Sequence, residues 1–138
     1  MQLGFENRTA VVTGASKGIG LAVARGLAAE GCSVHLVARD SAMLQKAAAS
    51  ISADFQVSAT PHALDLSRSE NIATLMAATD TPDILVNNAG AIPGGDLQAV
   101  DEARWRMAWD LKVFGYINMS GVVITVDGGH NARGGSFT

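Results

Sequence analysis

The chain has 138 residues, and its 10 Lys and Arg against 13 Asp and Glu give a formal net charge of −3. Hydrophobic residues make up 48% of it, enough for the core of one domain spanning residues 1–138, which excludes a wholly disordered chain. Because the chain has no basic cluster, no signal-like leader and no apolar run of about 18 residues, we expect a cytoplasmic protein without nucleic-acid or membrane partners.

The first half of the chain alternates short apolar runs with Ala-rich segments. The expected elements are, in order, a strand at 9–13, a helix at 19–30, a strand at 33–38 and a helix at 41–52. Gly31 suits the end of the first helix, because glycine readily adopts the left-handed conformation common there. Asp40 or Ser41 can cap the start of the second helix.

The second half continues the alternation. The expected elements are a strand at 56–64, a helix opened by residues 67–70 and running to about 78, a strand at 83–86, a loop at 90–95, a helix at 101–119, a strand at 121–126 and a polar tail at 130–138. Pro61 limits the pairing of the third strand or shortens it. Ser67 and Glu70 have the spacing of a capping box that opens the third helix. Strands that alternate with helices predict a parallel sheet in an α/β fold.

A glycine-rich turn joins the first strand to the first helix. Residues 13–20 read TGASKGIG, and Gly14, Gly18 and Gly20 leave room for a pyrophosphate to approach the N–H groups of a helix N-terminus. Lys17 adds a positive charge beside such phosphates. We interpret this turn as a dinucleotide site rather than an empty tight turn, since a strand precedes it and a helix follows.

Further motifs follow in order along the chain. Asp65 and Leu66 end the third strand, residues 87–90 read NNAG, Trp105 lies on the long helix, and 120–129 ends in Asp-Gly-Gly. With the Gly-x-x-x-Gly-x-Gly turn, this series resembles the short-chain dehydrogenase/reductase family over nearly the whole chain. The resemblance implies a doubly wound Rossmann fold, with helices on both faces of a parallel sheet whose order begins 3-2-1-4.

The resemblance also implies an activity and a set of binding residues. Family members are oxidoreductases that interconvert a carbonyl and an alcohol by hydride transfer with a nicotinamide cofactor, and they commonly assemble as homo-oligomers (dimers or tetramers). The implied cofactor-binding residues are Gly14, Ser16, Lys17, Gly18, Ile19 and Gly20 at the pyrophosphate, Arg39 at the 2′-phosphate, Asp65 and Leu66 at the adenine, and Asn88, Ala89 and Gly90 on the ribose side. The partner would be a small-molecule carbonyl or alcohol.

The residues after the second strand bear on the choice of cofactor. A carboxylate there accepts hydrogen bonds from the 2′-OH of NAD, whereas an arginine favours the 2′-phosphate of NADP. Arg39 stands at this position, and Lys17 supplies a second positive charge, so we predict NADP(H) rather than NAD(H). The alternative is that Arg39 is a solvated loop charge and that Asp40 contacts the ribose.

The family's proton-transfer residues, a Ser and a Tyr-x-x-x-Lys pair, have no match here. The single tyrosine, Tyr116, is followed four residues later by Ser120, so we name no catalytic residue and interpret Tyr116 as a packing or interface residue. A family member would continue past Met119 into further strands and helices before its last strand. We favour an internal segment omitted between Met119 and Ser120; the alternative is a non-catalytic NADP(H)-binding fragment or sensor. A methyltransferase-like domain is a third possibility, against which the NNAG and DGG motifs argue.

Two features of the long helix are ambiguous. Counting from Trp105, Lys112 stands where the family has an active-site asparagine, but it is equally well a surface residue. Trp105 and Trp109 share one helix face, which predicts a packing stripe or a subunit contact.

The cysteine and the histidines predict no further chemistry. Cys32 is the only cysteine, so no internal disulfide can form, and we expect it to be a small buried hydrophobe rather than a reactive thiol. His35, His62 and His130 lack the spacing of metal ligands, so no metal site is predicted.

Overall fold

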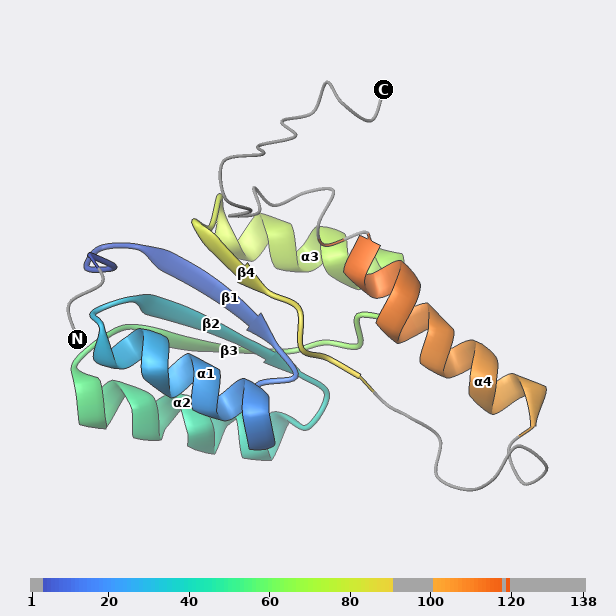
Figure 1. Ribbon diagram of the computed structural model, residues 1–138, viewed down its shortest axis with the longest axis horizontal. Coiled ribbons are helices and arrows are strands. Elements are labelled where there is room, and N and C mark those ends of the chain that lie inside the picture. Colours follow the sequence, from blue (N-terminus) through green and yellow to red (C-terminus); the bar gives the residue numbers. More distant parts are fainter. Residues whose placement is uncertain (1–3, 91–100, 118, 120–138) are drawn as a thin grey trace.

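A computed structural model describes residues 4–90, 101–117 and 119 (Figure 1). The expected strand at 121–126, the tail at 130–138 and nearly all of the loop at 90–95 lie outside the described residues. The described strands form one parallel sheet in the order β3-β2-β1-β4, as the family resemblance implied. They are β1 (Thr9–Thr13), β2 (Ser33–Ala38), β3 (Ala59–Ala63) and β4 (Ile84–Val86).

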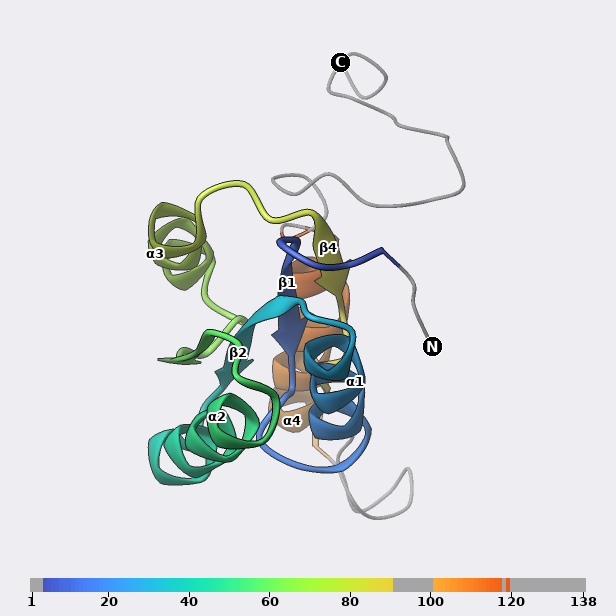
Figure 2. The same cartoon turned by 90° about the vertical axis from the view of Figure 1, so that its left-hand side faces the viewer.

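Helices cover both faces of the sheet, which confirms the doubly wound α/β fold (Figures 1 and 2). The described helices are α1 (Gly18–Ala29), α2 (Ser41–Phe55), α3 (Ser69–Thr79), α4 (Glu102–Trp109) and η1 (Asp110–Gly115). Ala10 and Val12 of β1 pack with α1 and α2, whereas Val11 faces α3 on the other side of the sheet. Strand β1 is therefore buried on both faces, as the central strand of a parallel sheet must be.

The second helix is longer than predicted, and the third strand is correspondingly shorter. Helix α2 runs on to Phe55, and Gln56 ends it in the left-handed conformation, with its N–H donating to the Ser52 carbonyl at 3.0 Å. At the start of α2, the Asp40 carboxylate accepts from the Met43 N–H at 3.0 Å, so Asp40 is the cap. The remaining strand pairs with β2 alone among the described strands, and this edge position tolerates Pro61, which has no N–H to donate.

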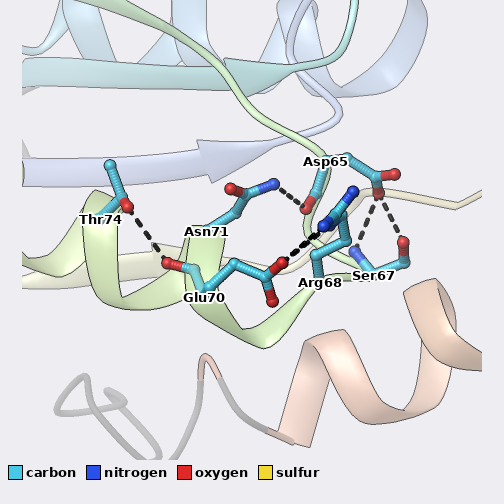
Figure 3. A network of polar contacts seen from close by, with 6 residues as sticks. All are labelled: Asp65, Ser67, Arg68, Glu70, Asn71 and Thr74. Atoms are coloured by element: carbon cyan, nitrogen blue, oxygen red, sulfur yellow. Dashed lines mark hydrogen bonds and ion pairs between the residues drawn. The ribbon is translucent and has the colours of Figure 1, made fainter.

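The predicted capping box at the start of α3 is wrong (Figure 3). The backbone N–H and the hydroxyl of Ser67 both donate to Asp65 Oδ1, at 3.0 and 2.7 Å, and the N-cap residue Arg68 makes no side-chain cap. Glu70 instead accepts from Arg68, with 2.8 Å between the ion-paired atoms. Helix α3 begins at Ser69, so its N-cap lies one residue later than the capping box requires, and the Ser67 side chain lies before the helix, where it donates to Asp65.

One long helix was predicted for residues 101–119, and the observed helix is not regular throughout. Asp101 caps α4 by accepting from the Arg104 N–H at 2.9 Å, but η1 is wound as a π-helix. In a regular α-helix, residues eight apart differ by about 80° around the axis. The wider π turn reduces this offset between Leu111 and Met119, both of which are buried against the α3 side of the sheet.

Candidate cofactor site

A cavity of about 480 Å³ opens at the edge of the sheet where the parallel strands end. The turn after β1, the residues that end and follow β2, and the segment after β4 all contribute to its wall. In open parallel sheets, ligands bind at this carboxyl edge, beside the point where the strand order reverses. In this sheet the reversal lies between β1 and β4, so the cavity occupies the position that the topology favours.

The turn between β1 and α1 brings backbone close to backbone. Gly14 has φ of +65°, and a Cβ atom there would lie 3.0 Å from the Asn88 carbonyl oxygen. At Gly20 a Cβ atom would lie 2.1 Å from the Gly14 carbonyl oxygen, which no side chain can accommodate. The N-cap residue of α1, Lys17, makes no side-chain cap, and the first turn of the helix carries no acidic residue. These features leave the first N–H groups of α1 suited to an anion.

The buried hydroxyl of Thr13 joins the end of β1 to the segment after β4. Thr13 Oγ1 accepts from the N–H groups of Asn88 and Ala89, each at 2.9 Å, and donates to the Val86 carbonyl at 3.3 Å. Asn88 Nδ2 also donates to the Gly14 carbonyl at 3.3 Å. The end of β1 and the segment after β4 are therefore joined by hydrogen bonds that regular strand pairing does not provide.

The residues after β2 have different roles. Asp40 and Arg39 both line the cavity and are exposed, but one Asp40 carboxylate oxygen is already the cap of α2. Arg39 lies close enough to Asp65 for its charge to lower the pKa of that carboxyl group. Lys17 also lines the cavity, so two cationic side chains border it, which suits a phosphorylated ligand.

The connection from β3 to α3 is held by a polar network (Figure 3). Asp65 accepts from Ser67 through its carboxylate, while the Asp65 backbone carbonyl accepts from Asn71 Nδ2 at 2.9 Å. Burial raises the pKa of the Asp65 carboxyl group, but the hydrogen bonds from Ser67 and the charges of Arg39 and Arg68 outweigh it, and the net shift is downward. The network fixes the path of the chain at Leu66, which is buried and lines the cavity.

Comparison with known proteins agrees with this geometry. Residues 8–133 match the family described as short chain dehydrogenase. The chain belongs to that family. It is 38% identical to dehydrogenase/reductase SDR family member 11 of Gallus gallus, over 79% of this chain and 45% of the relative.

Solved structures of the short chain dehydrogenase family share the fold. The L-sorbose reductase of Gluconobacter frateurii, complexed with NADPH and L-sorbose, superposes with a TM-score of 0.80 at 33% identity, over 88% of this chain and 48% of the other. A metagenomic short-chain oxidoreductase in complex with NADP gives a TM-score of 0.75 at 38% identity, over 83% of this chain and 54% of the other. The chain spans about half the length of the curated relatives it matches.

Ten of the twelve predicted cofactor-binding residues line the cavity at the carboxyl edge of the sheet. Gly20 and Asp65 do not: Gly20 lies under the turn against Gly14, and Asp65 holds the β3–α3 connection. The cavity residues that the sequence prediction missed are Val37, Ala38, Met43, Leu64 and Leu111, and Asp40 had been considered only as an alternative. The residues at the ends of β2 and β3 could have been predicted, because ligands bind where parallel strands end. Leu111 is distant in sequence from these strand ends, so the same argument does not reach it.

The structure also locates residues that the sequence singled out outside the cofactor-binding set. Burial raises the pKa of the Tyr116 phenol, opposite to the lowering that proton transfer near neutral pH would need. Lys112 lies within the π-helix η1. Trp105 and Trp109 are 37% and 56% exposed and border a shallow hollow with Phe114. Cys32 is buried, as predicted, with its thiol donating to the Arg8 carbonyl at 3.3 Å.

Two searches of the described residues concern metals and membranes. They contain no group of three or more His, Cys, Asp or Glu side chains that could hold a metal ion. None of the helices in the described part of the chain is long and apolar enough to cross a membrane.

Proposed function

We propose that this chain binds NADP(H) at the carboxyl-edge cavity and forms the nucleotide-binding part of an oxidoreductase that interconverts a carbonyl and an alcohol. The observation that carries the proposal is that Arg39 and Asp40, the two residues after β2, have different roles. Both residues line the cavity, but the Asp40 carboxylate, which would have to accept from the 2′-OH of NAD, already accepts from the Met43 N–H at the start of α2, whereas Arg39 contributes a guanidinium group. The structures of relatives in complex with NADPH and NADP support the same cofactor.

Different residues of the chain would contact different parts of the cofactor. The N–H groups at the start of α1 and the Lys17 ammonium would hold the pyrophosphate, and Arg39 would hold the 2′-phosphate. Leu66 would pack against the adenine, and Asn88 to Gly90 would border the ribose on the nicotinamide side. Bound NADP(H) would supply or accept the hydride, and a small-molecule carbonyl or alcohol would be its partner.

Paired titrations with NADPH and NADH test the proposal. We expect the wild-type chain to bind NADPH more tightly, and Arg39→Ala to weaken NADPH binding by about tenfold to a hundredfold while leaving NADH binding nearly unchanged, because a charge-assisted hydrogen bond contributes roughly 1.5–3 kcal/mol. Arg104→Ala is the matched control, since Arg104 is exposed on α4 and does not line the cavity. Comparable wild-type affinities for the two cofactors would refute the NADP(H) preference.

We also propose that the parent protein carries the missing Ser, Tyr and Lys in a segment that belongs between Met119 and Ser120. Support comes from the absence of Tyr-x-x-x-Lys in this sequence and from the greater length of the relatives. An intact mass of the native protein near twice 14.2 kDa is the expected result. A mass near 14.2 kDa would favour a non-catalytic NADP(H)-binding protein instead.

A homo-oligomer is the third part of the proposal. Trp105, Trp109, Phe114 and Ile117 are large side chains between 37% and 60% exposed on α4 and the helical residues after it. Contiguous exposed apolar surface of this kind marks an interaction site in a soluble protein. A second copy of the chain is the partner we propose for it, because the family resemblance implies association through this helix.

A further inference from the structure

Two histidines face each other across neighbouring strands. His35 lies in β2 and His62 in β3, and His35 Nδ1 is 2.9 Å from His62 Nε2, with ring centroids 5.1 Å apart. Both side chains are half-buried, and neither lines the cofactor cavity. They lie on the sheet face that Val37 shares with α3, because side chains two residues apart in a strand point the same way.

The contact between the rings depends on how many protons they hold. A hydrogen bond between two imidazoles needs one N–H group and one lone pair, which a neutral pair or a singly protonated pair can supply. When both rings are fully protonated, both facing nitrogens are donors and two positive charges oppose each other. The contact between His35 and His62 therefore tolerates at most one additional proton.

Among the described residues, no carboxylate offsets the lowering of either histidine's pKa. Residues 71–79 of α3, which covers this face, include no titratable side chain, and β1 presents Val11 there. Glu70 at the start of α3 is exposed and paired with Arg68, and Asp80 follows the end of the helix. Burial lowers the pKa of both histidines, and the charge of His62 lowers that of His35 further.

Strand β3 depends on this tie more than the inner strands do. Among the described strands it pairs only with β2, and Pro61 in its middle has no N–H group to donate. The strand leads directly to Leu64, whose N–H donates to the Ala38 carbonyl at 2.9 Å, and then to Leu66. Because both leucines line the cavity, a displacement of β3 changes the wall on which we place the adenine.

We propose that the His35–His62 pair is a proton-sensitive tie that holds β3, and with it the adenine side of the cavity, at neutral pH and releases them on acidification. The tie itself follows from the pair alone, whereas its effect on cofactor binding rests on the proposed function. Since the folded chain holds fewer protons than the unfolded chain, stability is retained above the ordinary histidine pKa and is lost as the pH falls below about 6.5.

The direct test removes the protons but keeps the hydrogen bond. In the double variant His35→Asn/His62→Gln, the amides can occupy the places of Nδ1 and Nε2 without titrating. Urea unfolding without cofactor, from about pH 8 to pH 5, should show the wild-type ratio of folded to unfolded chain falling roughly tenfold per pH unit for each proton taken up. The double variant should lack this component, and the control His130→Gln should follow the wild type. Equal slopes in the wild type and the double variant would overturn the tie.

Two further measurements distinguish the effect of the histidine pair on stability from its effect on NADPH binding. NADPH affinity should fall more steeply with acidification in the wild type than in the double variant, a comparison that cancels the titration of the ligand's own 2′-phosphate. Equal falls would overturn the coupling to the cavity, and absence of NADPH binding at every pH would refute the proposed function while the unfolding data still decide the tie. If the double variant fails to fold, the ring resonances of the wild type decide instead: stepwise titration below 6.5 supports the tie, and two independent titrations near 6.5 overturn it.

Discussion

The β1–α1–β2–α2 region and the α4–η1 helix of this member of the short chain dehydrogenase family differ in how completely they are packed. Helices α1 and α2 bury Ala24, Ala28, Leu44 and Ile51 against the sheet, whereas α4 has no buried residue. The long helix contacts the α3 side of the sheet through Leu111 and Met119, and most of its other large side chains are exposed.

This contrast separates a region that is packed within the chain from a surface for which we propose a partner. The cofactor turn depends on short backbone contacts around Gly14, Gly20 and Thr13, all within the well-packed region. Large apolar side chains of α4 are instead exposed, and the second copy that we propose as the partner of this surface would cover them. Substitutions in the two regions should therefore have different consequences.

The largest effect is expected at the glycine under the cofactor turn. Gly20→Ala places a Cβ atom against the Gly14 carbonyl, so we expect a loss of about 1–3 kcal/mol in the free energy of unfolding together with loss of NADPH binding. Gly26→Ala is the matched control in the same helix, where a Cβ atom meets no other atom within 4 Å. It should stabilise the chain by roughly 0.5–1 kcal/mol in urea unfolding, because alanine favours the helix. Equal effects of the two substitutions would show that the close contact at Gly20 is unimportant.

A similar loss of stability, but with a smaller effect on NADPH binding, should follow from loss of the hydroxyl that joins β1 to the segment after β4. Thr13→Val keeps the shape but leaves the N–H groups of Asn88 and Ala89 without their acceptor, so we expect a loss of about 1–3 kcal/mol by chemical denaturation. NADPH binding should weaken as well, since Asn88 and Ala89 line the cavity. Thr13→Ser retains the hydroxyl and should recover most of both properties. A Thr13→Val chain as stable as the wild type would contradict this role.

Substitution on α4 should affect assembly rather than folding. Trp109→Ser should weaken self-association by about fivefold or more, measured by sedimentation across a concentration series, because exposed tryptophans dominate many interfaces. Its effect on the free energy of monomer unfolding should stay within about 0.5 kcal/mol, as for other surface positions. Met107→Ser, on another face of the same helix, should leave assembly unchanged. A monomer at every concentration, or equal effects of both changes, would remove α4 as the interface.

The smallest effect concerns the pH dependence of the β3–α3 connection. The pKa of Asp65 is lowered in the folded chain, so its stabilising contribution is present above the ordinary value of 3.8 and is lost as the pH falls below it. Asp65→Asn should reduce the loss of stability between about pH 5 and pH 3 by less than about 1 kcal/mol, because the side chain is only half-buried. An unchanged acid-unfolding profile would show that Asp65 does not contribute through its charge.

Local patterns predicted much of the fold and of the site, and the failures have physical causes. The turn at 13–20 followed from glycines and apolar runs close together in sequence, whereas the strand order followed from the family resemblance. The capping box failed because α3 begins one residue later than the spacing of Ser67 and Glu70 requires, and Ser67 instead donates to Asp65, a contact that spacing alone does not reveal. Leu111 could not be predicted as a cavity residue, because its position depends on how the π-helix η1 packs on a sheet formed from distant segments.

The most direct test of the account is a map of where NADPH touches the chain. Backbone ¹H–¹⁵N spectra recorded during an NADPH titration should shift most at residues 14–20 and 88–90, with a further shift at Arg39 and little change on α4. Shifts concentrated on α4, or none at saturating NADPH, would contradict the placement of the cofactor at the carboxyl edge of the sheet.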